Sequence, residues 1–246
     1  MTLRRNVLKA TVAAVLASAA GVSFAQSDVI KVATDATFPP MEFMENDKFA
    51  GFDIELVEAV AAKMGKKVEW VNIDFKGLVP GLVSKRFDMA VSAIYITDER
   101  KKVVDFSDSY YAGGLVAMVK EGSPIKTLKD LDGKKVSVQV GTKSVIYLNE
   151  KHPQVQLVEV QKNQEMFNLV EIGRADAAVT GKPAAFQYIR TRGGMQVLGE
   201  QLTTEEYGMA VRKDLPQLTA SVNKALAALK SDGSYQAIVA KWFPNK

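Results

Sequence analysis

Short apolar runs alternate with stretches of helical periodicity along most of this 246-residue chain. Three apolar runs in the first part predict strands, at residues 29–34, 68–71 and 87–91. The stretches between and after them predict helices at residues 51–64, 78–85 and 97–102, the last with Thr97 as its N-cap. This alternation of strand and helix is typical of a mostly parallel sheet with helices on its faces.

A second unit of the same kind begins after the glycine pair at 113–114. Its expected strands cover residues 115–119, 136–140, 157–160 and 174–179, and its expected helices cover 144–150, 164–172 and 184–190. The run 207–211 predicts a strand that returns to the first unit, and helices at 215–230 and 235–242 close the chain. The pattern therefore indicates two α/β lobes joined by two crossings.

The two expected lobes share a short sequence echo. The segment RFDMAVS at 86–92 parallels RADAAVT at 174–180, with Arg, Asp, Ala, Val and a hydroxyl in register. Both segments stand in the same helix–turn–strand context, so we expect the lobes to use equivalent strand ends. We place lobe 1 at residues 26–110 and 208–246, and lobe 2 at residues 111–207.

Residues 1–25 have the pattern of an export signal. A positive segment with Arg4, Arg5 and Lys9 precedes an uncharged Ala/Val-rich run that is too short for a comfortable transmembrane span. Small residues follow, so we expect cleavage after Ala25. The paired arginines are also similar to a twin-arginine signal. General secretion is favoured because nothing in the chain demands a cofactor inserted before export, but the choice of route stays open.

Charge and cysteine content exclude several function classes. Removing residues 1–25 takes away three basic residues and no acids, so the formal charge falls from +4 to +1. Nucleic acid, which needs a concentrated basic face, is therefore not an expected partner. The chain has no cysteine, which excludes disulfides, a thiol nucleophile, a thiolate metal site and a lipid-anchored cysteine. Its single histidine, His152, cannot build a histidine-based zinc site. We expect a free, soluble periplasmic protein without metal or cofactor.

Polar residues gather at four expected strand ends. Asp35 and the loop 92–95 follow strands of lobe 1, while residues 139–142 and the pair at 180–181 follow strands of lobe 2. Ligands of open α/β sheets bind at the carboxyl ends of strands, so facing lobes would bring all four ends into one cleft. The Gly-Thr turn at 141–142 suits an anion. It lacks the spacing and lysine of a P-loop, which argues against a nucleotide.

Arg100 and two aromatic residues extend this candidate site. Arg100 comes soon after the loop 92–95, and a guanidinium is the group best shaped to hold a carboxylate through two parallel hydrogen bonds. Phe38 and Phe75 lie in expected loops after strands, where their rings could hold an aliphatic ligand chain. Other interpretations stay open here: segment 92–100 also fits a strand–loop–helix junction with a solvated charge run, and both rings also fit the core.

Several motifs together resemble one protein family. They are ATDATFPP at 33–40, GFDI at 51–54, ITDERK at 96–101, VDFS at 104–107, LKDLDGK at 128–134, VGT at 140–142 and GRADA at 173–177. The chain resembles the periplasmic polar-amino-acid-binding proteins of ABC importers, with the glutamine-binding protein nearest in pattern. The resemblance runs from about Val29 to Phe243.

This resemblance implies a fold and a mode of action. It implies the two-lobed type II periplasmic-binding-protein fold, in which each lobe is a mostly parallel sheet flanked by helices and two hinge crossings join the lobes. The lobes would close on a ligand, and a monomer would deliver that ligand to an ABC permease at the inner membrane. The implied ligand is a polar amino acid or a related carboxylate.

The resemblance also implies roles for individual residues. Arg100 would hold the ligand α-carboxylate, with the hydroxyl and backbone of Ser92, the backbone of Ala93 and, from the other lobe, Thr142. The remaining implied contacts come from Asp35, which would receive the α-amino group or a polar side chain, from Phe38 and Phe75, which would hold the aliphatic part, and from the second-lobe strand ends at Gln139 and Thr180.

Two positions depart from the family pattern. Gly181 replaces an Asp that pairs with the ligand ammonium, and Tyr95 replaces a small Ser or Thr, so that a phenol would fill part of the pocket or add a hydrogen-bonding group. Lys143 and Lys182 flank the second-lobe loops. A lysine pointing inward would favour a ligand with a second acidic group, whereas a lysine in such a loop more often faces solvent.

The fold is compatible with two other functions. Cyclohexadienyl dehydratases share it, but their acid-assisted elimination needs a proton donor in the cleft, and residues 180–185 supply none. A sensor module for a histidine kinase or a peptidoglycan-cleaving enzyme would require a separate partner. We therefore expect a binding protein rather than an enzyme.

Overall fold

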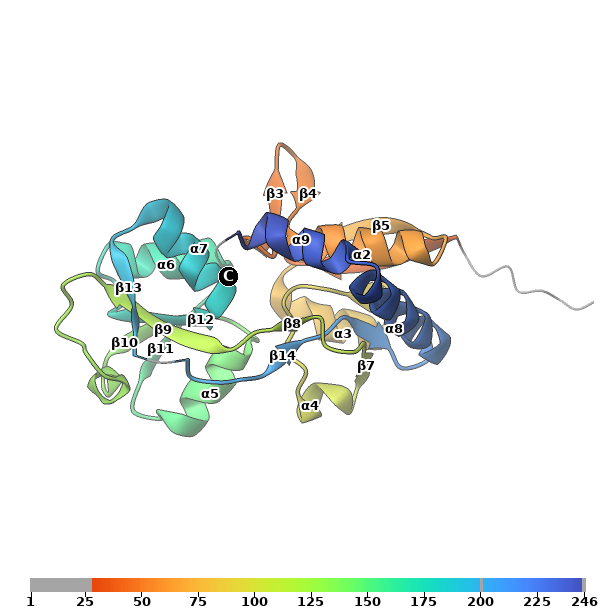
Figure 1. Ribbon diagram of the computed structural model, residues 1–246. Coiled ribbons are helices and arrows are strands. Elements are labelled where there is room, and N and C mark those ends of the chain that lie inside the picture. The colour runs from red at the N-terminus through yellow and green to blue at the C-terminus, as the bar shows by residue number, and fades with distance from the viewer. Residues whose placement is uncertain (1–27, 200, 245–246) are drawn as a thin grey trace, which may run out of the picture.

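The structure is a computed structural model that describes residues 28–199 and 201–244. Two bodies of sheet and helix lie side by side, joined by extended segments (Figure 1). The expected export signal and its cleavage after Ala25 lie outside the described residues. Within them, no helix is long and apolar enough to cross a bilayer.

The first body is built on a five-stranded sheet in the order β5-β1-β6-β15-β7. Its strands are β1 (Val29–Thr34), β5 (Lys67–Asn72), β6 (Met89–Ala90), β7 (Val104–Phe106) and β15 (Ala210–Arg212). Strand β1 runs parallel to β5 and β6, while β15 runs antiparallel to both β6 and β7. Four of the five strands therefore point the same way, and β15, which returns from the other body, opposes them.

The second body repeats this arrangement in the order β11-β10-β12-β9-β13. Its strands are β9 (Leu115–Lys120), β10 (Lys135–Gln139), β11 (Gln156–Val160), β12 (Ala177–Gly181) and β13 (Met195–Leu198). Here β9 is the opposed strand, antiparallel to β12 and β13, and β10 runs parallel to β11 and β12. The two sheets thus have equivalent topologies, in agreement with the fold class expected from the sequence.

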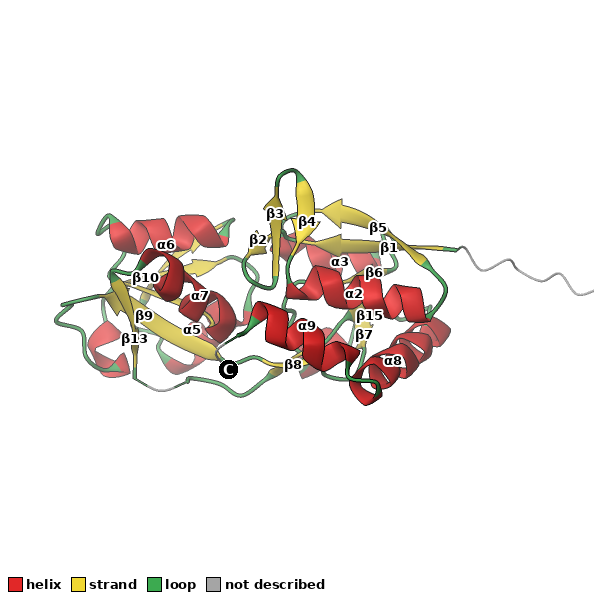
Figure 2. Ribbon diagram, turned by 45° about the horizontal axis from the view of Figure 1, so that its top comes forward, coloured by secondary structure: helices red, strands yellow, loops and turns green. Residues whose placement is uncertain are grey.

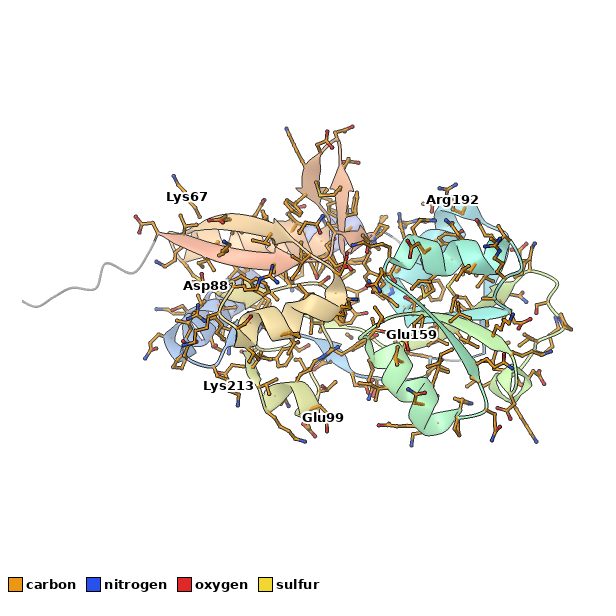
Figure 3. All side chains as sticks on the ribbon, turned by 180° about the vertical axis from the view of Figure 1, so that it is seen from behind. Lys67, Asp88, Glu99, Glu159, Arg192 and Lys213 are labelled. Atoms are coloured by element: carbon orange, nitrogen blue, oxygen red, sulfur yellow. The ribbon has the colours of Figure 1, made fainter. Side chains whose placement is uncertain are left out.

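The shared aspartate of the sequence echo makes the same pair of backbone hydrogen bonds in both lobes. In the first body the Asp88 carboxylate accepts a hydrogen bond from the Lys31 backbone N–H at 3.0 Å, and the Asp88 N–H donates to the Lys31 carbonyl. Asp176 makes the same pair of contacts with Lys135 in the second body, at 2.9 and 2.7 Å. Asp88 is labelled in Figure 3 beside the sheet of its lobe. The two aspartates therefore fix equivalent strands in the two lobes.

Helices cover both sheets (Figure 2). On the first body they are α2 (Phe52–Lys63), α3 (Leu78–Val83), α4 (Asp98–Lys101), α8 (Pro216–Ser231) and α9 (Ser234–Trp242), and on the second they are α5 (Lys143–Lys151), α6 (Asn163–Glu171) and α7 (Lys182–Arg192). Two 3-10 helices add Phe75–Gly77 and Leu128–Leu131. Helix α2 packs against α8 and α9, and the apolar stripe of α8 at Leu218, Val222, Leu226 and Leu229 is buried. The expected amphipathic faces are therefore core.

A hairpin that the sequence pattern did not indicate follows the first strand. It joins β3 (Glu42–Glu45) to β4 (Lys48–Ala50), and β2 (Thr37–Phe38) pairs with β3 to complete a small three-stranded sheet. Asn46 and Asp47 form its tip with φ of 49° and 60°, the left-handed conformation that two-residue hairpin turns require. Phe38 therefore lies in a short strand rather than a loop.

The hinge consists of two short antiparallel strands, β8 (Tyr111–Ala112) and β14 (Glu206–Tyr207). The loop that follows β6 bonds directly to this hinge: the Ile96 N–H donates to the Glu206 carbonyl at 2.9 Å, and the Gly208 N–H donates to the Ile94 carbonyl at 3.0 Å. We propose that lobe 1 comprises residues 26–110 and 208–246 and lobe 2 residues 111–207, because the crossings lie at these strands.

Candidate functional site

A small cavity of about 30 Å³ lies between the lobes. The sequence-predicted site residues on its wall are Asp35, Phe38, Phe75, Ser92, Ala93, Tyr95, Gln139, Thr142, Thr180 and Gly181. Its other lining residues are Glu42, Leu115, Ser144, Asn163, Val179 and Tyr207. Two sequence-predicted site residues, Arg100 and Lys143, do not line this cavity.

The convergence follows from where the strands end. Strand β1 ends one residue before Asp35, and β6 ends two residues before Ser92. In the second lobe, Gln139 is the last residue of β10 and Gly181 the last of β12, so the expected strand at 174–179 in fact starts later and includes Thr180. The carboxyl edges of the two sheets therefore face each other across the cavity.

Asp35 is buried and fully engaged by hydrogen bonds. Its side chain is 1% exposed. Oδ1 accepts from the Thr37 hydroxyl at 3.0 Å and from Lys162 Nζ at 3.2 Å, and Oδ2 accepts from the Phe75 N–H at 3.0 Å and from Gln139 Nε2 at 2.8 Å. A carboxylate offers about four acceptor sites, so this one has none left for another donor.

Lys162 was not among the residues expected from the sequence. It is the N-cap residue of α6, and its ammonium lies 3.2 Å from Asp35 Oδ1 and 2.7 Å from Asp74 Oδ1. Lys162, in lobe 2, thus forms ion pairs with two aspartates of lobe 1. Lys162 comes two residues after the end of β11, so the strand-end rule applied to this fifth strand would have found it.

Ser92 connects Asp35 to a buried acid. The Ser92 hydroxyl donates to Glu42 Oε1 at 2.7 Å and accepts from the Asp35 backbone N–H at 3.2 Å. Glu42 is 1% exposed. Burial, reinforced by the nearby Asp53 carboxylate, raises the pKa of Glu42 well above its ordinary value and so favours the protonated form of this side chain.

Asp53 holds the backbone of the same loop. Its Oδ2 accepts from the Ala93 N–H and from the Tyr110 hydroxyl, both at 2.8 Å, and burial raises the pKa of Asp53 to about 6. Ala93 has φ of 45°, a left-handed conformation that is strained for alanine. The Asp53 hydrogen bond therefore maintains the unusual backbone that faces the cavity.

Arg100 lies beside the cavity rather than on its wall. Its guanidinium donates to the Tyr95 carbonyl at 2.9 Å and, across the lobes, to the Gly141 carbonyl at 3.3 Å, and it stacks 5.6 Å from the centre of the Phe75 ring. Phe75 lines both the central cavity and a neighbouring one of about 200 Å³ that Arg100 also lines.

Within the described chain, no acidic oxygen lies within 4 Å of the Arg100 guanidinium. Burial lowers the pKa of Arg100 to about 10. Partial burial of a cation without a counter-charge is unfavourable. An incoming carboxylate would relieve that cost.

Two phenols occupy the lobe junction. The Tyr207 hydroxyl donates to the Tyr95 hydroxyl at 3.3 Å, and their ring centres are 4.7 Å apart. Both side chains are buried, and burial raises the pKa of each phenol, so both stay neutral. Tyr95 therefore fills part of the cavity and adds a hydroxyl, as its departure from the family pattern indicated.

Gly181 is explained by these aromatic neighbours. A Cβ at this position would lie 2.6 Å from the Tyr207 hydroxyl and 2.9 Å from the Phe38 ring. Any side chain here must displace one of them. The space that an acidic residue would need at position 181 is thus filled by Tyr207 and Phe38.

We expect Gly181→Ala to destabilise the protein by about 1–3 kcal/mol, because overpacking a tight site forces its neighbours to move. Urea unfolding measures the change. Gly77→Ala is the matched control, since its Cβ would meet nothing closer than 3.5 Å. Adding Tyr207→Phe to Gly181→Ala should recover part of the loss. Equal stability of Gly181→Ala and Gly77→Ala would contradict this explanation.

Lys143 and Lys182, the two lysines that flank the second-lobe loops, make their contacts outside the central cavity. Lys143 Nζ lies 3.4 Å from Glu205 Oε1, and Lys182 Nζ donates to Gln201 Oε1 at 3.3 Å. Neither side chain lines the cavity. Thr142 does line it, and its hydroxyl donates to the Gln139 carbonyl at 2.7 Å.

Similarity to known proteins extends over nearly the whole chain. Residues 30–245 match the family described as bacterial extracellular solute-binding proteins, family 3. The chain is 35% identical to the ABC transporter arginine-binding protein 1 of Escherichia coli, over 96% of this chain and 99% of that protein. It is 33% identical to the glutamine-binding protein GlnH of Bacillus subtilis, over 87% and 80% respectively.

Solved structures show the same fold. An ancestral arginine-binding protein bound to arginine superposes with a TM-score of 0.84 at 42% identity, covering 88% of this chain and 98% of that one. The ancestral protein bound to glutamine gives 0.84 at 41% identity, covering 89% and 99%. The similarity therefore extends over both lobes.

Proposed function

Because the chain belongs to family 3 of the bacterial extracellular solute-binding proteins, we propose that it binds a polar amino acid or related carboxylate between its lobes and delivers it to an ABC permease. The observation that carries this proposal is the guanidinium of Arg100. It is partly buried, bonded to carbonyl oxygens of both lobes, and without an acidic partner within 4 Å in the described chain.

The proposed carboxylate contacts come from both lobes. Arg100 holds the carboxylate. The Ser92 and Thr142 hydroxyls, which donate to Glu42 Oε1 and to the Gln139 carbonyl in this structure, rotate toward it, while the Ala93 N–H stays bonded to Asp53. Phe38 and Phe75 contact the aliphatic part. Phe75 supports this assignment because its ring stacks on Arg100 and also lines the cavity.

Asp35 has a different proposed role from that implied by the family resemblance. Its acceptor sites are filled by Thr37, Phe75, Gln139 and Lys162. We therefore propose that it holds the lobes together rather than receiving a ligand ammonium. Residue 181 is glycine, so neither this position nor Asp35 supplies a free carboxylate for the α-amino group of a ligand.

Ligand entry requires the lobes to separate. A cavity of about 30 Å³ has room for two or three water molecules, each of which needs roughly 10–15 Å³. An amino acid therefore enters an open form, and closure follows from contacts made by both lobes. Closure is the signal that we propose the permease detects.

The family and the relatives are binding proteins, and nothing in them supports the dehydratase alternative. We propose that the mature protein is a monomer without a lipid anchor, exported to the periplasm after cleavage at Ala25. The lack of cysteine in the chain supports the proposed absence of a lipid-modified cysteine at the cleavage site.

A thermal-shift screen with calorimetry tests the function. A ligand at 100 times its Kd stabilises the native state by about 2.7 kcal/mol, which is about 5–10 °C in Tm for a protein of this size. We expect such a shift from at least one compound in a panel of amino acids, their deaminated analogues and small dicarboxylates. No shift from any member, with turnover of prephenate, would replace this proposal with the dehydratase.

A further inference from the structure

The Gln139 side chain has a fixed orientation at the floor of the cavity. Its Nε2 donates to Asp35 Oδ2 at 2.8 Å and to the Gln161 carbonyl at 3.0 Å. Both partners act as acceptors here, since Asp35 Oδ2 also accepts from the Phe75 N–H, Asp35 Oδ1 pairs with the Lys162 ammonium, and the Gln161 group is a carbonyl. A reversed amide would place oxygen against oxygen twice, so Gln139 Oε1 points away from Asp35.

This orientation fixes the next amide in turn. Gln139 Oε1 accepts from Asn163 Nδ2 at 2.9 Å. Reversing the Asn163 amide would set two oxygens against each other, so its Oδ1 is the remaining acceptor. We call Asp35, Gln139 and Asn163 the amide relay. It passes from a charged acid of lobe 1 to the first residue of α6 in lobe 2.

Asn163 Oδ1 ends the relay without a donor. The residue is 3% exposed and lines the cavity, and no described residue donates a hydrogen bond to this oxygen. Leaving a buried acceptor unsatisfied costs about 1–3 kcal/mol. A ligand that supplies an N–H or O–H at this point recovers that cost.

We propose that Asn163 is a specificity-determining residue and that it selects a ligand bearing a neutral donor, a primary amide or hydroxyl, at the end away from the Arg100 carboxylate contact. This inference rests on the proposed function and specifies the ligand of the same site. Because Asp35 fixes the orientation of both amides in the relay, the group left for the ligand is an acceptor, and the ligand must supply a donor.

The two charged alternatives fit this point less well. A ligand carboxylate would place a second acceptor against Asn163 Oδ1, and among the relay groups only the second N–H of Asn163 Nδ2 is left to donate to it. A ligand cation would need a counter-charge. Asp35 is already paired with Lys162, and burial raises the pKa of Glu42, the other acid on the cavity wall, which disfavours its charged form. A neutral amide or hydroxyl satisfies the acceptor without burying charge.

Calorimetry on matched compounds tests the proposal. The pairs are asparagine with aspartate, glutamine with glutamate, and homoserine with 2-aminobutyrate, so that each pair differs at the far end. We expect wild-type protein to bind the neutral-donor member of at least one pair 10-fold or more tightly. Asn163→Leu should reduce this ratio to below about 3-fold by weakening that member. The control Asn168→Leu, on the exposed side of the same helix, should keep the wild-type ratio.

Three results would overturn the inference. They are tighter binding of the acidic or alkyl member by wild-type protein in every pair, an unchanged ratio in a folded Asn163→Leu variant, and an equal loss in Asn168→Leu. The wild-type ranking is decisive even if Asn163→Leu fails to fold. If none of the six compounds binds but another carboxylate raises Tm, the proposed selectivity of Asn163 is wrong and the proposed function stands. If no compound of the panel raises Tm, both proposals are wrong.

Discussion

Replacing Arg100 with methionine is expected to weaken binding of a carboxylate ligand by at least about 30-fold while leaving the unliganded protein as stable as wild type. The guanidinium has only neutral partners in the described residues, the carbonyls of Tyr95 and Gly141 and the Phe75 ring. Removing it therefore leaves no buried anion unpaired. In the complex the same change leaves the ligand carboxylate without its cation, a loss of about 2–5 kcal/mol.

Calorimetry with the tightest ligand from the panel measures the affinity, and urea unfolding without ligand measures the stability. Lys101→Met is the matched control. It removes a neighbouring cation that is exposed and lies 3.7 Å from Asp98, so its effect on both quantities should be small. Binding by Arg100→Met within 5-fold of wild type would contradict the carboxylate role. A large loss of unliganded stability would instead show that Arg100 is a structural residue.

Asp53→Ala is expected to destabilise the protein by about 3–5 kcal/mol. The substitution leaves three buried groups without their partner: the Ala93 N–H, the Tyr110 hydroxyl and the Glu42 carboxyl. Unsatisfied buried polar groups cost about 1–3 kcal/mol each. Because Asp53 also holds the left-handed Ala93, ligand affinity should fall with stability. A loss below 1 kcal/mol in urea unfolding would contradict this account.

Glu42→Gln is the companion variant, because a glutamine reproduces a protonated glutamic acid. Burial raises the pKa values of Glu42 and Asp53, so the native state holds protons that the unfolded chain releases. Their contribution to stability is therefore complete below about pH 4 and declines as the pH rises through the native values, about 6 for Asp53. Glu42→Gln has no proton to lose at this position. Its stability relative to wild type should increase between pH 4 and 7, and a constant difference would contradict a protonated Glu42.

The sequence located most of the cavity through one physical rule. Parallel strands place their carboxyl ends at one edge, so Asp35, Ser92, Gln139 and Thr180 could be brought together from the strand pattern alone. The N-cap was also visible: the Thr97 hydroxyl accepts from the Arg100 N–H at 3.3 Å, as expected. The same rule was not applied to β11, which is why residues 162 and 163 were missed.

Other features depend on tertiary contacts that carry no local signal. Glu42 belongs to a hairpin, and nothing in its neighbourhood distinguishes a buried neutral acid from an exposed carboxylate. Arg100 was expected to face the cleft, yet its side chain lies against Phe75, and this direction is set by packing between distant segments. The partners of Asp35 come largely from outside its own segment, and Lys162 lies 127 residues away. That Asp35 is saturated could be seen only in three dimensions.

The loop that follows β6 is joined to the hinge by hydrogen bonds, and this has a mechanical consequence. Residues 94 and 96 bond directly to residues 206 and 208, on both sides of the Tyr95–Tyr207 bridge. Tyr95 therefore belongs to the pivot and to the cavity wall at once. A ligand that contacts this ring therefore acts directly on a residue of the hinge. We expect variants of this loop to change the ligand affinity and the angle between the closed lobes together.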